Sequence, residues 1–398
     1  MRLYLFPIFA VIVNAAIDFY IYAKLKRAWR PKPVIRAHTC LSVLPLIMLL
    51  AAVAALSTGF PRVPLRGIMW MIFVYLTIYI PKYFGMITAA VLSVPKLVGR
   101  KAPRRTSTVA LVVGAIVFIA MWWGSIVTRY SVQTREVTIE RENIPAQFDG
   151  YRIAQFSDIH LGSYGSDTAF ISRVVDNINA LNPDLICFTG DIVNSHTDEA
   201  YPFKQTLSRL KAPDGVMSIL GNHDYGDYNR WNNPIERNIN NAKLEQLERD
   251  MGWTLLNNTS TVISRGNDSI AIIGVENWGE PPFPKYGRLS DAYPDLNDNA
   301  FKILLSHNPK HWQMEVVPTS NIDITLAGHT HAMQVEIDLP GGRRMSIARL
   351  KYKEWGGLYQ NGRQLLYVNT GIGQVAVPMR IGATPEITLI TLKSKPQP

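Results

Sequence analysis

Five short clusters of polar residues hold most of the side chains that could do chemistry. Their letters are SDIH, TGDIV, GNHD, SHNP and GHTH, and they contain five of the chain's eight histidines. The clusters offer carboxylate, imidazole and amide groups without a thiolate, which suits divalent ions such as Mn²⁺, Fe²⁺, Zn²⁺ or Mg²⁺. The candidate ligands are Asp158, His160, Asp191, Asn222, His307, His329 and His331.

The spacing of these residues predicts a shared site. Asp158 and His160 are two positions apart, as are His329 and His331. In extended backbone the members of each pair would project to the same side. One such motif alone would more often be a solvated loop or a packed core histidine. Seven donors together exceed one ordinary metal site, so we expect two divalent ions that share a bridging carboxylate.

Apolar runs of four to six residues precede the clusters and predict buried strands. Helical patterns between several of them indicate a β-α alternation, a fold in which ligands bind beyond the carboxyl ends of the strands. All five clusters are placed there. The expected strands cover residues 152–156, 184–188, 216–220, 301–305 and 322–327, and the expected helices cover residues 168–181, 199–210 and 234–251.

The first third of the chain is built from long apolar runs. Each has about the 20 residues that a helix needs to cross a bilayer. The first run could instead be a cleaved signal peptide, but it is long, lacks a small-x-small cleavage site and precedes three more runs. We therefore expect four transmembrane helices in an anchor of residues 1–130, a linker of residues 131–149 and a catalytic domain of residues 150–398. The runs cover residues 3–23, 39–57, 68–94 and 107–128.

The distribution of the formal charge of +10 predicts how the chain is oriented in the membrane, not binding to nucleic acid. The first 149 residues carry 18 basic and 5 acidic side chains, whereas residues 150–398 carry 23 basic and 26 acidic ones. Loops rich in Lys and Arg stay in the cytoplasm. With four spans, the catalytic domain would lie outside the cytoplasm, in the periplasm of a Gram-negative cell. The two basic loops contain Lys24, Lys26, Arg27, Arg30, Lys32 and Arg36, and Lys96, Arg100, Lys101, Arg104 and Arg105.

Two ionisable residues fall inside apolar runs, where charges are costly and often functional. They are Asp18, about one turn from the first basic loop, and Lys82, which follows Pro81. Their positions favour mutual pairing or snorkelling over a role in transport.

The ordered set of motifs resembles the calcineurin-like metallophosphoesterases. The arrangement of several spans before this domain is similar to the membrane-anchored branch of that family, which includes proteins resembling UDP-2,3-diacylglucosamine pyrophosphatase. The resemblance implies a four-layer α/β/β/α sandwich with the site at its rim. It also implies the distribution of ligands: Asp158, His160 and His331 on one metal, Asn222, His307 and His329 on the other, and Asp191 bridging.

The resemblance further implies that the two ions activate a shared water for in-line attack on phosphorus. His223 would act beside the leaving oxygen as general acid or oxyanion stabiliser, with Asp224 orienting its imidazole. Its alternative role is to support a neighbouring ligand. Two features depart from the family pattern. Ala332 and Met333 follow the last motif, where many relatives have Gly-Gly. Soluble cytoplasmic UDP-diacylglucosamine pyrophosphatases tend to carry Arg at the position of His223, which weakens the transfer of their specific substrate to this chain.

The membrane anchor favours a phosphorylated lipid or another membrane-associated phosphoester as substrate, with the bilayer as partner and no nucleic acid. Residues 278–293 and 343–355 mix aromatic and basic side chains, as an interfacial contact does. A β-hairpin with a solvated basic face explains them equally well. Two other functions remain open: hydrolysis of soluble phosphodiesters or nucleotides by an anchored enzyme, and a catalytically silent metal-binding sensor. The His223-Asp224 pair argues against the sensor, which needs no acid.

Overall fold

The computed structural model describes residues 2–27, 31–58, 65–95, 99, 101, 103, 105–281, 283–341 and 343–395, without the side chains of residues 2–9 and 56–58. The chain forms two compact units. One contains residues 1–125 and 376–379, and the other contains residues 126–375 and 380–398. Four residues of the two basic loops lie outside the described residues: Arg30, Lys96, Arg100 and Arg104.

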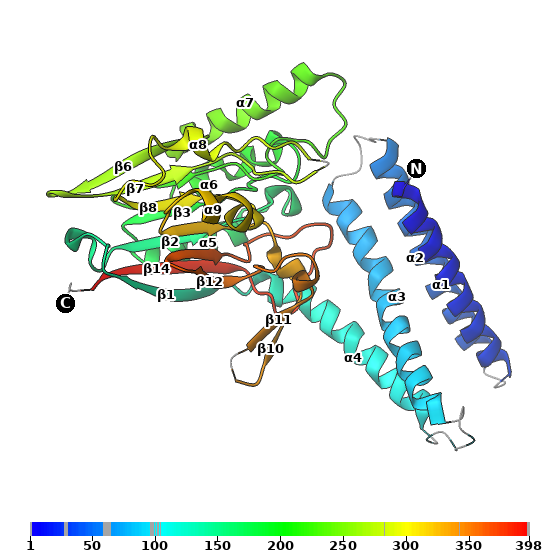
Figure 1. The fold of residues 1–398 in the computed structure, drawn as a ribbon. Coiled ribbons are helices and arrows are strands. Elements are labelled where there is room, and N and C mark those ends of the chain that lie inside the picture. Colours follow the sequence, from blue (N-terminus) through cyan, green and yellow to red (C-terminus); the bar gives the residue numbers. More distant parts are fainter. Residues whose placement is uncertain are drawn as a thin grey trace. The chain divides into compact units, whose positions relative to one another are not determined.

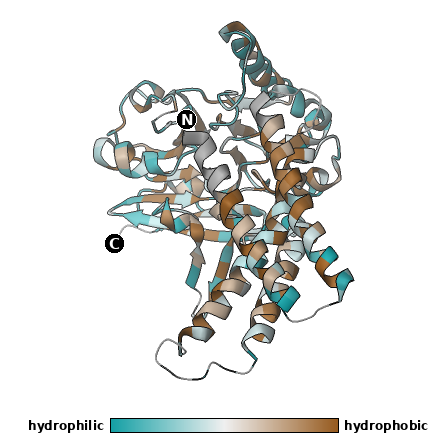
Figure 2. Cartoon of the chain, turned by 90° about the vertical axis from the view of Figure 1, so that its right-hand side faces the viewer, coloured by the Kyte–Doolittle hydropathy of each residue, from teal (hydrophilic) through white to brown (hydrophobic). Residues whose placement is uncertain are grey.

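Long apolar helices make up the first unit (Figure 1). In the part of the chain that the structure describes, three of them are long and apolar enough to cross a membrane, at Lys32–Ala55, Leu65–Ser93 and Thr106–Tyr130. Figure 2 shows that apolar residues predominate along them. By length and composition these helices are candidates for three of the four expected spans. The helix bounds are α1 Arg2–Arg27, α2 Lys32–Thr58, α3 Leu65–Ser93 and α4 Thr106–Ile126.

An ion pair joins α1 to α3 within this unit. The ammonium group of Lys82 lies 2.7 Å from one carboxylate oxygen of Asp18, and the Tyr79 hydroxyl donates to the other oxygen at 2.8 Å. Both charged side chains are largely buried, with exposed fractions of 16% and 13%. The expected mutual pairing is therefore confirmed. Because a low-dielectric surrounding penalises an isolated charge, this pair holds the two helices in register.

We predict that breaking this pair destabilises the helical unit more than removing it. Asp18→Ala leaves the Lys82 ammonium buried without its counter-ion, which costs about 3 kcal/mol. The double variant Asp18→Leu with Lys82→Met should lose less than that single variant. Thermal unfolding in detergent measures both, with Phe19→Ala on exposed surface of α1 as the control. A loss in the double variant as large as that in Asp18→Ala would contradict the pairing.

Two six-stranded sheets organise the second unit, together with a separate two-stranded ribbon (Figure 1). The first sheet has the order β1 (Gln133–Arg141), β14 (Glu386–Ser394), β2 (Arg152–Phe156), β3 (Leu185–Phe188), β4 (Val216–Ser218) and β5 (Trp253–Leu255). The second has the order β12 (Gly357–Asn361), β13 (Gln364–Val368), β9 (Ile324–Ala327), β8 (Phe301–Leu305), β7 (Asp268–Gly274) and β6 (Thr259–Arg265). The ribbon pairs β10 (Glu336–Leu339) with β11 (Arg343–Ser346). The helices are α5 (Ala169–Ala180), α6 (Lys204–Leu207), α7 (Pro234–Asp250), α8 (Leu289–Ala292) and α9 (Val317–Thr319).

The five expected strands and two of the three expected helices are present. The exception is the helix expected over residues 199–210, where the structure has short 3₁₀ turns and the four-residue α6. Pro202 lies in the second of these turns and lacks the N–H that a continuous helix needs. Residues 131–149, expected as a linker, instead supply β1, which pairs in parallel with β14 from Gln133 to Arg141. The segment is therefore an edge strand of the first sheet.

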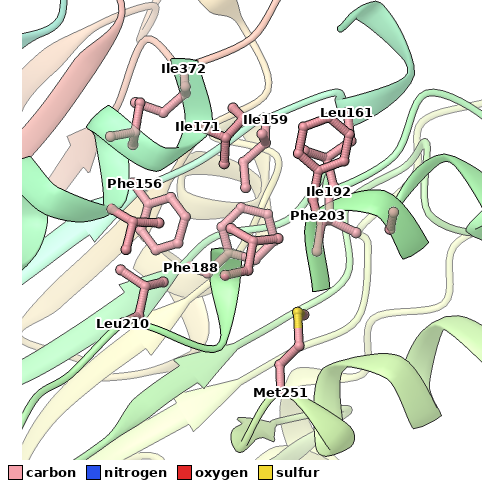
Figure 3. Packing of buried hydrophobic residues seen from close by; sticks show 14 of the residues in the cluster. Phe156, Ile159, Leu161, Ile171, Phe188, Ile192, Phe203, Leu210, Met251 and Ile372 are labelled. Carbon is pink, nitrogen blue, oxygen red and sulfur yellow. The ribbon is translucent and has the colours of Figure 1, made fainter. Parts of the chain in front are cut away.

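Both faces of the central strands are buried, which explains their nearly continuous apolar sequences. On one face, Ile153 of β2 shares a core with Ile303 of β8, so this core contains residues of both sheets. On the other face, Phe156 and Phe188 lie 4.9 Å apart between ring centres and pack with Ile171 of α5 (Figure 3). Close packing on both sides holds the carboxyl ends of these strands in fixed positions.

Candidate metal centre

The seven candidate ligands lie in the loops that directly follow five strands. β2, β3 and β4 contribute from the first sheet, and β8 and β9 contribute from the second. Six of the seven side chains are buried, and His329 is partly buried. Residues as far apart in sequence as Asp158 and His331 therefore meet at one place.

One group of donors comprises Asp158, His160 and His331. The Nε2 atom of His331 lies 3.1 Å from a carboxylate oxygen of Asp158 and 3.0 Å from Nε2 of His160. Three donor atoms, one from each side chain, lie within 4.8 Å of one another, close enough to surround one ion.

A second group comprises Asn222, His307 and His329. The amide oxygen of Asn222 lies 2.7 Å from Nδ1 of His329 and 3.0 Å from Nε2 of His307. Asp191 lies between the two groups: its Oδ2 atom is 3.2 Å from Nε2 of His307 and 3.6 Å from Nε2 of His160. This single carboxylate oxygen thus faces both sets of donors.

The protonation states of these side chains fit a cationic ligand. Burial, followed by the charge of His307, lowers the pKa of His329 to about 3, and burial also lowers the pKa of His160. Burial alone would raise the pKa of Asp158, but the neighbouring His331 holds it well below its usual value. Burial would lower the pKa of His307, but Asp191 raises it to about 9. A proton on His307 thus occupies a position that a metal ion would take.

The lone pairs of the imidazoles provide a second test of fit. Ring nitrogens of His160 and His331 face each other at 3.0 Å, and those of His307 and His329 at 3.2 Å. Within the described residues, Nδ1 of His160 is buried without a hydrogen-bond partner. Desolvated acceptors that converge in this way need a shared cation, so the donor set fits divalent metals.

The backbone that aims these ligands differs from the expected extended conformation. Asp158 has φ 54°, His160 has φ 51°, Asp191 has φ 61°, His329 has φ 74° and His331 has φ 49°. The left-handed region is unfavourable for residues other than glycine and persists where the surroundings impose it. The expectation that extended backbone brings each pair together is therefore wrong, and tight left-handed turns do so.

Two glycines of the motifs make room for the carboxylates. A Cβ atom on Gly221 would lie 2.2 Å from Oδ1 of Asp191, and one on Gly328 would lie 2.3 Å from Oδ2 of Asp158. Such distances are far inside van der Waals contact. Glycine in front of Asn222 and His329 is thus a steric requirement of the site.

The imidazole of His223 is held by the chain in a way the sequence did not indicate. Its Nδ1 atom lies 2.7 Å from the carbonyl oxygen of Asn194, and its ring stacks on Tyr228 with a centroid distance of 4.4 Å. Because a carbonyl oxygen only accepts, Nδ1 carries the proton in this contact. Nε2 is therefore the nitrogen left to exchange a proton with a substrate.

Asp224 has a different partner from the expected one. Its carboxylate accepts hydrogen bonds from the backbone amides of Asp191 at 2.8 Å, Ile192 at 2.9 Å and Gly221 at 2.8 Å. Burial and the charge of Asp191 raise the pKa of Asp224 to about 7. The expectation that Asp224 orients the His223 ring is wrong. Asp224 instead ties together the loops after β3 and β4, and the Asn194 carbonyl orients the imidazole.

Two tyrosines that no sequence motif marks support the candidate ligands. The Tyr352 hydroxyl lies 3.0 Å from Nε2 of His329, and the Tyr228 hydroxyl accepts from the Asn222 amide nitrogen at 2.8 Å. The second contact turns the Asn222 oxygen toward the two imidazoles. Tyr352 lies in the aromatic and basic segment 343–355, which gave no signal for a role at the site.

A hollow of about 350 Å³ adjoins Asn222 and His329. Its walls include the aromatic rings of Tyr228, Phe283 and Tyr352, together with Lys310 and Lys351. Glu280 also lines the hollow and pairs with the Lys310 ammonium at 2.8 Å, which leaves Lys351 as the uncompensated cation. Aromatic surface beside this ammonium group suits an anionic substrate with an apolar part.

Comparison with known sequences identifies the family. The profile described as "Calcineurin-like phosphoesterase" matches residues 151–333, and one described as "Probable Calcineurin-like phosphoesterase, transmembrane domain" matches residues 1–129. The chain belongs to the calcineurin-like phosphoesterase family. It is thus an enzyme of the metallophosphoesterase class with a membrane domain.

Relatives with and without an assigned activity resemble this phosphoesterase. It is 35% identical over 274 residues to the uncharacterized metallophosphoesterase YkuE of Bacillus subtilis, covering 67% of this chain and 87% of that protein. It is 28% identical over 301 residues to the UDP-2,3-diacylglucosamine pyrophosphatase LpxG of Chlamydia trachomatis, covering 64% and 88%. It is also 28% identical over 298 residues to a transmembrane protein with metallophosphoesterase domain of Danio rerio, covering 73% of this chain and 63% of that protein.

We predict that Tyr352→Phe weakens one metal site of this phosphoesterase. Loss of the hydroxyl removes the partner of His329 Nε2, and such supporting contacts are worth about 10 to 100-fold in metal affinity. Titration of the metal-free protein with Mn²⁺, followed by calorimetry, measures the change. Tyr293→Phe, whose hydroxyl donates to Asp298, is the matched control. Equal affinity in wild type and Tyr352→Phe would show that the contact does not support the ligand.

Proposed function

We propose that this phosphoesterase hydrolyses a phosphoester or pyrophosphate bond of a lipid or other membrane-associated substrate at two divalent ions. The proposal rests on the position of Asp191 Oδ2. This oxygen lies 3.2 Å from Nε2 of His307 in one group and 3.6 Å from Nε2 of His160 in the other. Asp158, His160 and His331 would hold one ion, Asn222, His307 and His329 the other, and Asp191 would bridge them. Such a pair of ions supplies an activated water and neutralises charge on the phosphoryl oxygens.

Residues of the chain itself bind the substrate and supply the proton that the leaving group needs. His223, held at Nδ1 by the Asn194 carbonyl, presents Nε2 to the leaving oxygen and donates a proton to it. Lys351 in the adjoining hollow binds anionic oxygens, and Lys310, which pairs with Glu280 at 2.8 Å, lies beside it. The Tyr228 ring, stacked on His223, keeps the imidazole in place and shields one of its faces.

The lipid part of the proposal is supported by three observations. The chain has membrane-spanning helices, the hollow beside the site has aromatic walls, and one relative is named for a pyrophosphatase that acts on a diacylated nucleotide sugar. A soluble phosphodiester uses the same metal chemistry but needs no apolar wall.

We predict that two variants separate metal binding from proton transfer. His223→Gln should lower kcat about 10² to 10⁴-fold with both metals retained, because it removes a general acid. Asp191→Asn should lose metal and activity together, as should treatment of wild type with a chelator. The assay uses protein purified in detergent with Mn²⁺ against a model phosphodiester and a lipid phosphate, and elemental analysis gives metal content. His196→Gln, on a histidine that contacts the Trp231 ring edge-to-face outside the ligand groups, is the control.

The outcomes distinguish the candidate functions. Equally slow hydrolysis of both esters by wild type and Asp191→Asn rejects the enzymatic proposal and leaves a metal-binding sensor. Turnover of the soluble ester alone rejects the lipid substrate.

We also propose that α1 is a fourth span and that the catalytic unit lies outside the cytoplasm as a four-layer α/β/β/α sandwich. α1 has 26 residues, and the matched transmembrane profile includes it. Lys24, Lys26 and Arg27, which the sequence assigned to the first basic loop, lie in the last turn of α1. For the layering, one core contains residues of both sheets, while α5 and α8 contribute to separate cores that involve one sheet each.

We predict that a fusion placed after Pro398 reports an extracytoplasmic catalytic unit. Alkaline phosphatase at this point should be active, and a fluorescent protein that matures only in the cytoplasm should be dark. The same reporters after Lys101, in the third expected loop, should give the reverse pattern. A bright fluorescent fusion after Pro398 would place the enzyme in the cytoplasm.

A further inference from the structure

The β10–β11 ribbon presents an apolar face to its surroundings. Ile337 pairs across the ribbon with Met345, and Leu339 pairs with Arg343. Because side chains alternate along a strand, Ile337, Leu339 and Met345 share one face. Their exposed fractions are 51%, 38% and 44%.

The opposite face of the ribbon attaches it to the unit through polar contacts. Glu336 and Ser346 are buried there. Arg344 forms an ion pair with Glu336, and the Ser346 hydroxyl donates to the carbonyl oxygen of Ala332. A hairpin that faces water normally turns its polar side outward. This ribbon does the reverse.

The short 3₁₀ helix η9 (Ile347–Leu350) follows β11 directly and adds exposed apolar side chains. Leu350 is 92% exposed and Ile347 is 49% exposed. We call the five residues Ile337, Leu339, Met345, Ile347 and Leu350 the ribbon patch. Clustered exposed side chains of this size mark a contact surface rather than ordinary solvated surface.

Basic side chains accompany the ribbon patch. Among the described residues from 336 to 353, the exposed charged side chains are one carboxylate, Asp338, and four cations, Arg343, Arg349, Lys351 and Lys353. Apolar side chains with cations beside them match the interface of a bilayer that contains anionic lipid. The candidate membrane spans of the same chain also favour a bilayer over a protein as the partner of this surface.

We propose that the ribbon patch docks the catalytic unit on the surface of a lipid bilayer. The apolar side chains enter the boundary between headgroups and acyl chains, and the four cations contact anionic headgroups. In residues 278–293, the other segment expected at an interface, two of the aromatic rings already have partners within the unit. The Trp278 ring stacks on His311 and the Tyr286 ring stacks on Tyr225, inside the unit.

The docking surface leads directly to the metal centre. Lys351 follows Leu350 and lines the hollow, and Tyr352 contacts His329 at 3.0 Å. A headgroup at the ribbon patch would thus lie next to the cations that receive a phosphorylated substrate. This inference deepens the proposed function and depends on it only for the identity of the bound lipid.

Lipid quenching of a fluorophore on the ribbon patch tests the proposal. Full-length Cys40→Ala protein carries an environment-sensitive fluorophore at Leu350→Cys and is placed in nanodiscs that contain brominated lipid. The matched control is Ile235→Cys on α7, a residue that is also apolar and 68% exposed. Quenching at position 350, stronger with phosphatidylglycerol than with phosphatidylcholine alone, is expected, and position 235 should be unaffected. No quenching at 350, with a second probe at Met345→Cys equally unaffected, overturns the proposal.

Kinetics distinguish failure of docking from failure of the proposed function. Ile347→Asp with Leu350→Asp should raise KM for a lipid phosphate in anionic vesicles about tenfold, while turnover of a soluble model phosphodiester is unchanged. Wild type inactive on every ester would reject the proposed function and leave the quenching result valid. Energy transfer between differently labelled copies in detergent would show that the ribbon patch binds a second chain, which also overturns the bilayer proposal.

Discussion

The buried carboxylate of Asp191 is the interaction on which the rest of this phosphoesterase depends. A carboxylate without solvent is costly unless its oxygens are fully used. Oδ1 accepts the backbone amide of His223 at 2.8 Å, and Oδ2 faces the imidazoles of His307 and His160. A second carboxylate, Asp224, lies close enough to have its own pKa raised by this charge. A bound metal cation would neutralise these clustered carboxylates. Metal binding and the stability of the loops are therefore linked.

The two sheets provide the rigidity that this arrangement needs. Left-handed backbone at five of the seven ligands costs about 1 to 3 kcal/mol at each residue. The loops can hold it because they are short, begin at strands buried on both faces and hydrogen bond to one another. For example, the Asp158 amide donates to the Gly190 carbonyl at 2.8 Å, and the His160 amide donates to the Asp191 carbonyl at 3.2 Å. Strain at the strand ends is thus balanced by packing in the cores beneath them.

Residue types and spacing predicted the strands and the convergence of donors, since both depend on local patterns. They failed where a contact joins distant segments. The pairing of β1 with β14 spans almost the whole unit, and the contacts of His223 with Asn194 and of His329 with Tyr352 join loops that carry no recognisable motif. The role of Asp224 was wrong for a related reason: sequence adjacency to His223 suggested a partner, but the turn directs the carboxylate at backbone amides. A positive φ angle at a ligand other than glycine cannot be read from the sequence.

Charge gives the two parts of the chain different relations to a membrane. Residues 150–398 carry more acidic than basic side chains, 26 against 23, so most of the catalytic unit gains nothing from an anionic surface. The segment from Arg343 to Lys353 is the local exception, with five basic side chains and no acidic one. If an anionic surface attracts only this short segment, it orients the unit as well as binding it. Rotation of the unit would bring carboxylates in place of cations against the surface. The same segment contains Tyr352, whose hydroxyl contacts His329, so the proposed electrostatic orientation would also turn the candidate metal centre toward lipid headgroups.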